Sequence, residues 1–226
     1  MSRETILARL RSSGRSESID LPETLPDFPA YDDPVEQFRV EIERVGGVFL
    51  DARRADSLVE CLSGVLAQRG AEQFVWEGSA VFERHQIPVR YLAEQASTEH
   101  GFLTSMHADS SVSLPIEVLP AGDLDLPAVQ VSVSSAVCAI AETGSIVEST
   151  AVAGSRVLPI LVPHHVVLVS SSDFVQNSAE FFGQLEPGKR ESAQILMTGP
   201  SRTADIEKTL IIGVHGPQSL TVIVTG

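Results

Sequence analysis

The chain has 226 residues, of which 43% are hydrophobic and 20% are charged, a composition that favours one globular domain of α/β type with a small appendage. Its 30 acidic and 16 basic residues give a formal net charge of -14, which repels DNA, RNA and anionic lipid and argues against a nucleic-acid partner. Because no apolar run approaches the roughly 18 to 20 residues that span a bilayer, and no signal-peptide core opens the chain, we expect a soluble cytoplasmic protein without membrane insertion.

Residues 1–33 are predicted to form a helical arm followed by a linker. Ile6, Leu7 and Leu10 share one side of a short amphipathic helix, and a polar stretch with several prolines follows at residues 12–33. Such an arm can dock a partner, fold back on its own domain or remain mobile, and we favour the last two.

Residues 34–226 are predicted to form the compact domain, which begins with alternating helices and strands. Apolar residues at helical spacing predict one helix that starts at Pro34 and stops at a pair of glycines, and another that ends at Gly70. Short strands are predicted after them, at residues 48–50 and 73–76. This alternation predicts an α/β fold in which a mostly parallel sheet carries helices on both faces.

The second half of the chain is predicted to be rich in strands. Residues 101–126 mix serine, proline and acidic residues without clear periodicity, so we expect them to be irregular. Beyond them, apolar runs predict strands and one segment rich in phenylalanine predicts a helix. The predicted strands are residues 129–133, 137–141, 146–147, 166–169 and 221–225, and the predicted helix is residues 174–182.

The sequence contains no pattern that predicts a metal site or an intrinsic cofactor. Cys61 and Cys138 lie far apart in apolar settings, so we expect two buried thiols and no zinc or iron–sulfur site. Residues 183–189 match most of a phosphate-binding P-loop, but Arg190 stands where that loop needs a serine or threonine for Mg²⁺. The motifs G-x-G-x-x-G and G-x-S-x-G do not occur.

The segment TGPSRTADIE, residues 198–207, is suited to binding an anion through its backbone. The apolar residues before Thr198 predict a strand, Gly199 breaks it, and Ser201 begins a predicted helix. The first turn of a helix presents unpaired N–H groups and a partial positive charge to phosphate or carboxylate groups, and Arg202 can add a bidentate contact.

The alternative is that this predicted helix binds no ligand. Thr198 or Ser201 would then cap the helix, while Asp205 and Glu207 would complement its dipole. The pattern alone leaves both interpretations open.

A second candidate turn, AETGS, occupies residues 141–145. Gly144 can adopt a left-handed conformation there, and Thr143 and Ser145 can offer hydroxyl groups to an anion at the end of a strand. The alternative is a β-hairpin turn whose hydroxyl groups satisfy the local backbone.

Carboxylates and imidazoles near these turns are candidates for acid–base or covalent chemistry. Glu142 and Glu148 flank the threonine–glycine pair of this turn, and either could act as a base or nucleophile if buried. Adjacent residues of a strand point to opposite faces, so only one of His164 and His165 can face a site, and we keep His165 as a secondary candidate. His215, in the GVHGP turn, can contact the same ligand as the TGPSRTADIE segment. The plain alternatives are solvated glutamates and hydrogen-bonded structural histidines.

The AETGS turn, the TGPSRTADIE segment and the GVHGP segment occur in this order, and together they resemble the lactate utilisation protein C family, whose shared unit is called the LUD domain. The resemblance is close over the C-terminal part of the chain and looser over the rest. It implies a fold similar to that of ribose-phosphate isomerase, glucosamine-phosphate deaminase, CoA transferases and formyltetrahydrofolate cyclo-ligase, which bind phosphorylated or carboxylated ligands.

The motifs of the resemblance give a set of candidate site residues. The candidates for anion or cofactor binding are Thr143, Gly144, Ser145, Thr198, Gly199, Ser201, Arg202 and Thr203, with His165, Asp205 and Gly216 as secondary candidates. The catalytic residues are open, and their candidates are Glu142, Glu148 and His215.

The resemblance implies an accessory role in the oxidation of L-lactate to pyruvate, alongside two partner proteins of which at least one carries iron–sulfur clusters. In this hypothesis a small anion, a nucleotide or part of a cofactor binds between the two turns. The alternative is a stand-alone isomerase, transferase or cyclo-ligase that acts on a phosphorylated or CoA-linked small molecule, with Glu142 or Glu148 and His215 as its reacting groups. A structural scaffold without a ligand is the third interpretation.

Overall fold

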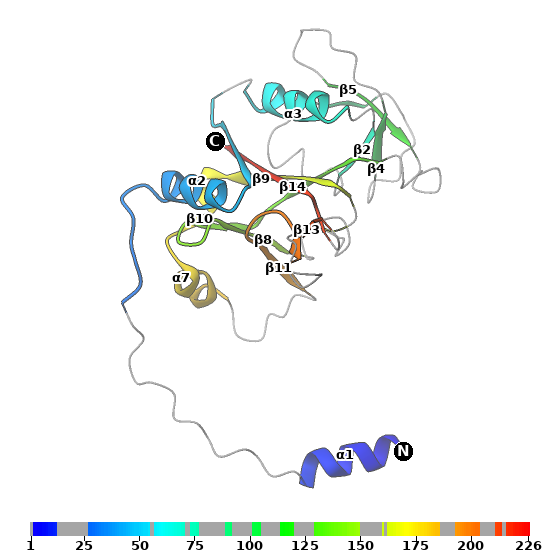
Figure 1. Cartoon of the computed structure of the whole chain (residues 1–226), viewed down its shortest axis with the longest axis vertical. Coiled ribbons are helices and arrows are strands. Elements are labelled where there is room, and N and C mark those ends of the chain that lie inside the picture. The colour runs from blue at the N-terminus through cyan, green and yellow to red at the C-terminus, as the bar shows by residue number, and fades with distance from the viewer. Residues whose placement is uncertain are drawn as a thin grey trace.

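The computed structural model of the chain describes residues 2–12, 27–54, 57–70, 73–76, 89–91, 101–104, 114–119, 129–149, 160, 162–185, 193–203, 211–213 and 216–226. Within these residues the chain forms an eight-stranded sheet, a four-stranded sheet and a two-stranded ribbon, with helices packed on the sheets (Figure 1). The elements in chain order are α1 Arg3–Ser12, α2 Pro34–Arg44, β1 Val48–Ala52, α3 Ser57–Gln68, β2 Gln73–Trp76, β3 Val89–Tyr91, β4 Gly101–Thr104, β5 Leu114–Leu119, β6 Val131–Ser135, β7 Cys138–Ile140, β8 Ser145–Ser149, β9 His164–Ser170, a 3-10 turn Ser171–Asp173, β10 Phe174–Val175, α7 Ser178–Gly183, β11 Gln194–Met197, β12 Arg202–Thr203, β13 Ile211–Ile212 and β14 Ser219–Thr225.

The eight-stranded sheet, here called the main sheet, has the strand order β1-β14-β9-β6-β2-β4-β5-β3. Its neighbouring strands from β1 to β2 are all parallel. Strand β4 runs antiparallel to β2 and β5, while β3 and β5 are parallel. The prediction of a mostly parallel sheet in an α/β fold is therefore confirmed.

Alternation along the central strands divides the buried side chains between the two faces of the main sheet. Val167 of β9 and Val222 of β14 share a core cluster with Phe38 and Ile42 of α2 and with Ile146 of β8, so α2 and the four-stranded sheet cover this face. Helix α3 contacts β1 and β14 from the other side (Figure 1). Helices therefore lie on both faces, which is why the central strands are apolar on both sides.

The four-stranded sheet, of order β10-β7-β8-β11, is itself covered by α7. Val147 of β8, Ile140 of β7 and Phe181 of α7 form a second core cluster on its outer face. Because successive side chains of a strand point to opposite faces, Ile146 and Glu148 of β8 point back toward the main sheet. Glu148 thereby reaches the space between the two sheets.

Helix α2 begins and ends where the sequence predicts. Asp33 Oδ1 accepts hydrogen bonds from the N–H groups of Val35 at 3.0 Å and Glu36 at 3.1 Å. Pro34 occupies the first turn, where an N–H group would have no helical partner. The helix stops before Gly46, whose φ of 88° suits a glycine.

The prediction that residues 101–126 are irregular is wrong for two segments within them. Strands β4 and β5 pair with each other; β4 also pairs with β2, and β5 with β3. Hydrogen bonds to distant segments stabilise these strands, and local periodicity does not report such pairing. The remainder of that range lies outside the described residues.

Helix α7 starts later than the helix predicted at residues 174–182. Phe174 and Val175 form β10 beside β7. Asn177 Oδ1 then accepts a hydrogen bond from the Glu180 N–H at 2.9 Å, and this N-cap fixes the start of the helix.

The N-terminal helix is confirmed, and the end of the linker contacts the domain. In Figure 1, α1 lies apart from the two sheets, and Ile6 is 48% exposed. The Asn177 side chain donates a hydrogen bond to Pro29 O at 3.0 Å, and the Tyr31 N–H donates one to Gln176 Oε1 at 2.7 Å. The end of the linker therefore contacts the domain at Pro29 and Tyr31.

Candidate functional site

The structure brings the two predicted turns together. Thr143 Oγ1 lies 2.7 Å from Ser145 Oγ, which lies 2.6 Å from Thr198 Oγ1, so three hydroxyl groups form one hydrogen-bonded chain. Strand β8 follows the first turn, β11 precedes the second, and their antiparallel pairing places the turns side by side. These three candidates therefore share one location.

The glycines of both turns pack against helix α2. AETGS is the hairpin turn between β7 and β8, in which Gly144 has a φ of 64°. A Cβ atom on Gly144 would lie 2.5 Å from the backbone nitrogen of Ile42, and one on Gly199 would lie 2.9 Å from Val45 Cγ2. AETGS is therefore a β-hairpin turn, although its printed hydroxyl contacts are to other hydroxyl groups and not to the local backbone, and the two glycines permit close packing on α2.

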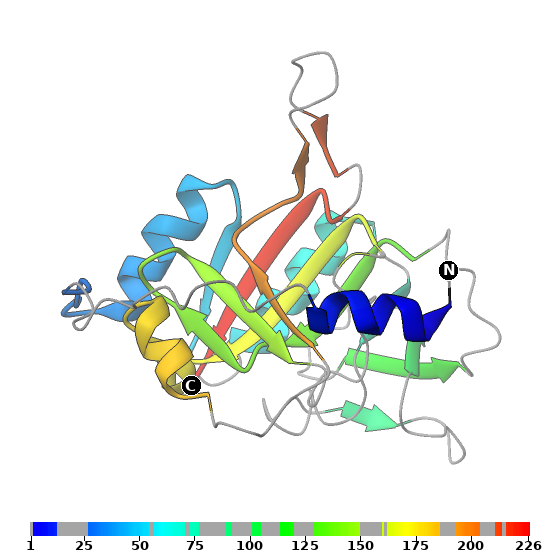
Figure 2. The ribbon, with the colours of Figure 1, turned by 90° about the horizontal axis from the view of Figure 1, so that it is seen from below.

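The prediction that a helix begins at Ser201 is wrong. Arg202 and Thr203 form β12, which pairs antiparallel with Ile211 and Ile212 of β13. Figure 2 shows this ribbon projecting beyond the two sheets. The backbone of β12 is engaged in the ribbon, so it does not present the free N–H groups of a first helical turn.

The GVHGP segment contacts the start of the ribbon. The Ser201 N–H donates a hydrogen bond to Pro217 O at 2.9 Å, and the Gly213 N–H donates one to Ser201 O at 3.0 Å. A Cβ atom on Gly216 would lie 3.2 Å from Ser201 Oγ, so this secondary candidate also belongs to the contact. The candidates that lie outside the described residues are Asp205, His215 and the side chain of Thr203.

Arg202 contacts the C-terminal end of α2. Its Nη2 donates a hydrogen bond to the carbonyl oxygen of Val45, the C-cap of that helix. The end of a helix carries unpaired carbonyl groups and a partial negative charge, so a guanidinium there is stabilising. The predicted contact between Arg202 and a bound anion stays a prediction beside this observed helix cap.

Replacing Arg202 by alanine is expected to lower the free energy of unfolding by about 0.3 to 1 kcal/mol, because it removes one exposed charged contact with a helix end. Urea denaturation measures the change, and Arg11→Ala in α1 is the control with the same loss of charge. A loss above about 3 kcal/mol would contradict a simple capping role.

Glu142 caps helix α7. Its Oε2 accepts hydrogen bonds from the backbone N–H and the hydroxyl of Ser178, at 3.1 and 3.3 Å. A carboxylate in this place pairs with free N–H groups and complements the helix dipole. The structure therefore gives Glu142 a capping role and leaves Glu148 as the better placed candidate for acid–base chemistry.

Glu148 belongs to a buried polar cluster between the two sheets. Its Oε1 lies 2.7 Å from His165 Nε2 and accepts a hydrogen bond from Ser134 Oγ. His165 Nδ1, on the other side of the ring, lies 2.6 Å from Ser132 Oγ. We call these four residues the inter-sheet cluster; His165 is 0% exposed and Glu148 2%.

Strand register explains why the cluster forms. In the parallel pair of β6 and β9, Ser132 lies beside His165 and Ser134 beside Val167, so both serines share the sheet face of His165. Glu148 approaches this face from β8 in the sheet above it. A carboxylate and an imidazole are thus buried with each other and two hydroxyl groups as hydrogen-bond partners.

One atom of the inter-sheet cluster lacks a partner. Within the described part of the chain, no group forms a hydrogen bond with the buried Oε2 of Glu148. A buried acceptor left unpaired costs about 1 to 3 kcal/mol, and more if it is charged. The cluster therefore combines the geometry of an acid–base pair with one open acceptor position.

Sequence reasoning found two members of this cluster and missed two. Glu148 was a candidate for catalysis and His165 a secondary candidate, and the structure brings them together. Ser132 and Ser134 were missed, although they alternate with valines in VSVSS and so place two hydroxyl groups on one strand face. Ser132 and Ser134 reach His165 only through the register between β6 and β9, which cannot be read from the sequence.

His164 faces away from the inter-sheet cluster, as predicted for neighbours on a strand. Its Nδ1 lies 2.8 Å from Ser219 Oγ. Burial, followed by the positive charge of Arg69, lowers the pKa of His164 below its ordinary value. The folded chain therefore binds this proton less readily than the unfolded chain, and His164 reduces stability as pH falls through the ordinary histidine range.

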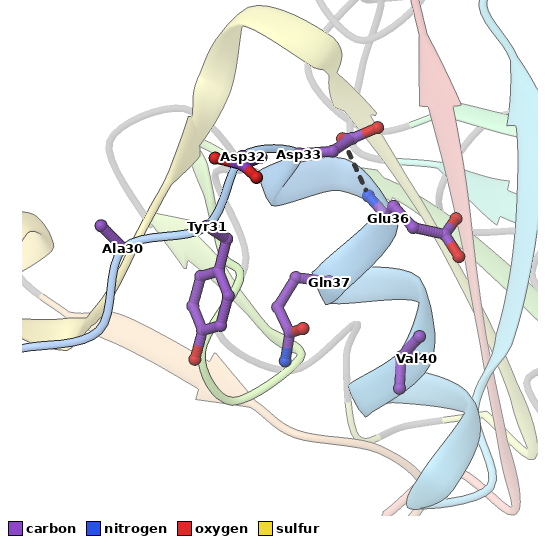
Figure 3. A pocket seen from close by; sticks show the side chains of 7 residues that line it. All are labelled: Ala30, Tyr31, Asp32, Asp33, Glu36, Gln37 and Val40. Atoms are coloured by element: carbon purple, nitrogen blue, oxygen red, sulfur yellow. Dashed lines mark hydrogen bonds between the residues drawn. The ribbon is translucent and has the colours of Figure 1, made fainter.

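An open hollow of about 380 Å³ lies at the start of α2, and the residues that line it belong to neither predicted turn. Figure 3 shows the side chains around it, which are Ala30, Tyr31, Asp32, Asp33, Glu36, Gln37 and Val40. Its three carboxylates disfavour an anion, and Asp33 is already engaged as the cap of α2. This hollow is not the predicted anion site.

The cysteines agree in part with the prediction of buried thiols. Cys138 is buried, and burial raises its pKa to about 12, whereas Cys61 is only half-buried. In the described residues, no group of three His, Cys, Asp or Glu side chains is placed to hold a metal ion. The helices among these residues include none with the length and apolar character that crossing a membrane requires.

Comparison with known families identifies related proteins. The family model of the LUD domain matches residues 35–225. A protein of Deinococcus radiodurans named Lactate utilization protein C is 37% identical over 90 residues, which cover 39% of this chain and 42% of that protein. Proteins of the same name are 34% identical over 90 residues in a Geobacillus species, covering 38% and 37%, and 25% identical over 189 residues in Bacillus pumilus, covering 81% and 74%.

The fold also has a counterpart among solved structures. The crystal structure of a DUF162 family protein from Deinococcus radiodurans is similar with a TM-score of 0.51 at 19% identity. The similarity covers 85% of this chain and 96% of that chain. It supports the α/β architecture described above.

Proposed function

Since the chain belongs to the LUD domain family, we propose that it takes part in the utilisation of L-lactate. The observation that carries this proposal is the family match over residues 35–225, together with relatives named Lactate utilization protein C. In this proposal the protein is an accessory subunit that acts with iron–sulfur partner proteins in the oxidation of L-lactate to pyruvate.

The proposed division of labour follows from the chemistry of the reaction. Conversion of lactate to pyruvate releases two electrons and two protons, so the electrons need an acceptor. The chain has two cysteines, whereas an ordinary iron–sulfur cluster is held by four thiolates. We therefore assign the iron–sulfur clusters to the partners and none to this protein.

A pocket for a small anion or cofactor at residues 141–145 and 198–207 stays a prediction. The hydroxyl chain of Thr143, Ser145 and Thr198 supports it, because hydroxyl groups can donate to an anion. Calorimetry with phosphate, a nucleotide and CoA tests it. Binding that is lost in Ser145→Ala or in Arg202→Ala, and kept in the exposed control Glu60→Ala, would support the pocket.

Growth of a deletion strain tests the proposed function itself. We expect loss of growth on L-lactate as the sole carbon source, normal growth on glucose, and recovery when the intact gene is restored. Purification of the tagged protein should also recover its iron–sulfur partners. Normal growth of the deletion strain on lactate, without any recovered partner, would contradict the proposal.

One observation favours the second candidate, a stand-alone isomerase, transferase or cyclo-ligase acting on a phosphorylated or CoA-linked molecule. Glu148 and His165 have the contact that acid–base catalysis needs. Turnover of such a substrate by the isolated protein, abolished in His165→Gln, would favour this candidate over the accessory role.

A further inference from the structure

Helix α1 presents an apolar side with positive charge at both of its ends. Arg3, Leu7 and Arg11 follow one another at intervals of four residues, so they form one row along the helix, beside Ile6. Three arginines and one glutamate give α1 a net charge of +2, in a chain whose net charge is -14. In Figure 1 the helix lies apart from the two sheets, and Ile6 is 48% exposed. An acidic surface with an apolar centre would complement this row.

The exposed side of α2 has the complementary pattern. Glu36, Val40 and Glu43 lie at intervals of four and three residues and form one row on that helix. Val40 is 46% exposed, and it lines the hollow of about 380 Å³ together with Asp32 and Glu36. Figure 3 shows Asp32 before the first turn of α2, with Glu36 and Val40 farther along the helix. The row on α2 is therefore acidic, apolar and acidic, where the row on α1 is basic, apolar and basic.

We propose that α1 of this chain docks antiparallel on this side of α2 and fills the hollow. Leu7 then covers Val40, while Arg11 faces Asp32 and Arg3 faces Glu43. The spacings agree, because residues 3–11 rise by about 12 Å and residues 33–43 by about 15 Å, a difference that long arginine side chains can bridge. This inference concerns an internal docking surface and does not depend on the proposed role in lactate utilisation.

The ion pairs within α2 leave its exposed side acidic. Arg39 donates hydrogen bonds to both oxygens of Glu36 and to Oε2 of Glu43. Together with Asp32 and Asp33, this group of four carboxylates and one guanidinium keeps a net charge of -3. A carboxylate has acceptor sites on both oxygens, so Glu43 can receive a second guanidinium through Oε1.

The wall of the hollow opposite α2 is held in place by the domain. The Tyr31 N–H donates a hydrogen bond to Gln176 Oε1 at 2.7 Å, and the Asn177 side chain donates one to Pro29 O at 3.0 Å. Asp33, at the base of this wall, caps α2. The surface is thus formed before docking, which lowers the cost of ordering it.

The connection between α1 and the hollow favours the helix of the same chain over that of a second copy. Seventeen residues, 13–29, separate Ser12 from Ala30 at the rim of the hollow. They can span up to about 60 Å, several times the length of α2, which is about 16 Å. Docking within one chain avoids the cost of bringing two molecules together, so exposed ion pairs that are individually weak can suffice.

Disulfide trapping in the full-length chain tests the docking. Leu7→Cys is combined with Val40→Cys in a Cys61→Ser background, which removes the half-buried native thiol and leaves the buried Cys138. The matched control combines Leu7→Cys with Leu196→Cys, because Leu196 is 44% exposed on the edge strand of the four-stranded sheet. On mild oxidation we expect the Val40 pair to cross-link at least about tenfold faster than the control, with the mobility of a monomer on a non-reducing gel.

Charge reversal tests the proposed ion pairs. Adding Arg3→Glu and Arg11→Glu should slow the cross-link to Val40 about tenfold, and adding Asp32→Arg and Glu43→Arg to the same chain should restore it. Salt at about 1 M should slow the cross-link in the chain with native charges, because it screens exposed pairs. Circular dichroism confirms that each variant is folded.

Three outcomes would overturn the inference. Equal cross-linking of the Val40 and Leu196 pairs would show that α1 has no preference for α2. A cross-link that appears only as a dimer would assign the surface to α1 of a second copy. A rate that is unchanged when the charges of α1 are reversed would show that the acidic row does not recognise the arginines.

Discussion

Replacement of Glu148 by alanine is expected to lower the free energy of unfolding by about 3 to 5 kcal/mol. The change leaves His165 Nε2 and the hydroxyl of Ser134 without their shared acceptor in a fully buried place. Buried polar groups that lose a partner keep their desolvation penalty. Urea denaturation followed by far-ultraviolet circular dichroism measures the loss.

Two controls separate the cluster from a general effect of removing a carboxylate. Glu60→Ala removes an exposed carboxylate and should change stability by less than about 0.5 kcal/mol. The double variant Glu148→Ala with His165→Ala should lose less than the sum of the single variants, because the second change removes the group left unpaired by the first. Strictly additive losses would show that the two side chains are not coupled.

Replacement of Phe38 by alanine is expected to cost about 3 to 5 kcal/mol. Phe38 is 0% exposed, and its ring lies 5.3 Å from that of Phe174 in an edge-on contact and 6.4 Å from that of Phe49. The substitution would leave a cavity where α2, the main sheet and the four-stranded sheet meet. Thermal and urea unfolding measure the effect.

The control for Phe38 lies on the same helix. Val40 is 46% exposed, so Val40→Ala should cost less than about 0.5 kcal/mol. If Phe38→Ala lost no more than this control, the assignment of α2 to the core between the sheets would be wrong.

The parts of the fold that depend on local signals were predictable. Asp33 and Pro34 indicate the start of α2, and Gly46 indicates its end. Apolar runs in the sequence predict the central strands. Strands β4 and β5 were not predictable, because long-range pairing stabilises them. The same cause explains why the helix predicted to begin at Ser201 is wrong. Arg202 and Thr203 pair with β13, although the apolar residues that follow have helical spacing in the sequence.

In the candidate site, too, contacts between residues far apart in the chain could not be predicted from local sequence patterns. The sequence indicated that Thr143, Ser145 and Thr198 belong together, and their hydroxyl groups do meet. The sequence did not predict the contact of Arg202 with Val45, which is 157 residues away in the chain. No local pattern reports such a contact, since it depends on where α2 packs.

The inter-sheet cluster depends on register as well as on residue type. Glu148 and His165 are conspicuous in the sequence, but Ser132 and Ser134 become partners only because β6 and β9 pair in parallel at one register. A shift of one residue would turn both serines to the opposite face.

The most direct test of the proposed lactate role is growth of a deletion strain on L-lactate as the sole carbon source. We expect no growth on L-lactate, normal growth on glucose, and growth on both once the intact gene is restored. Growth of the deletion strain on L-lactate at the rate of the intact strain would contradict the proposed role.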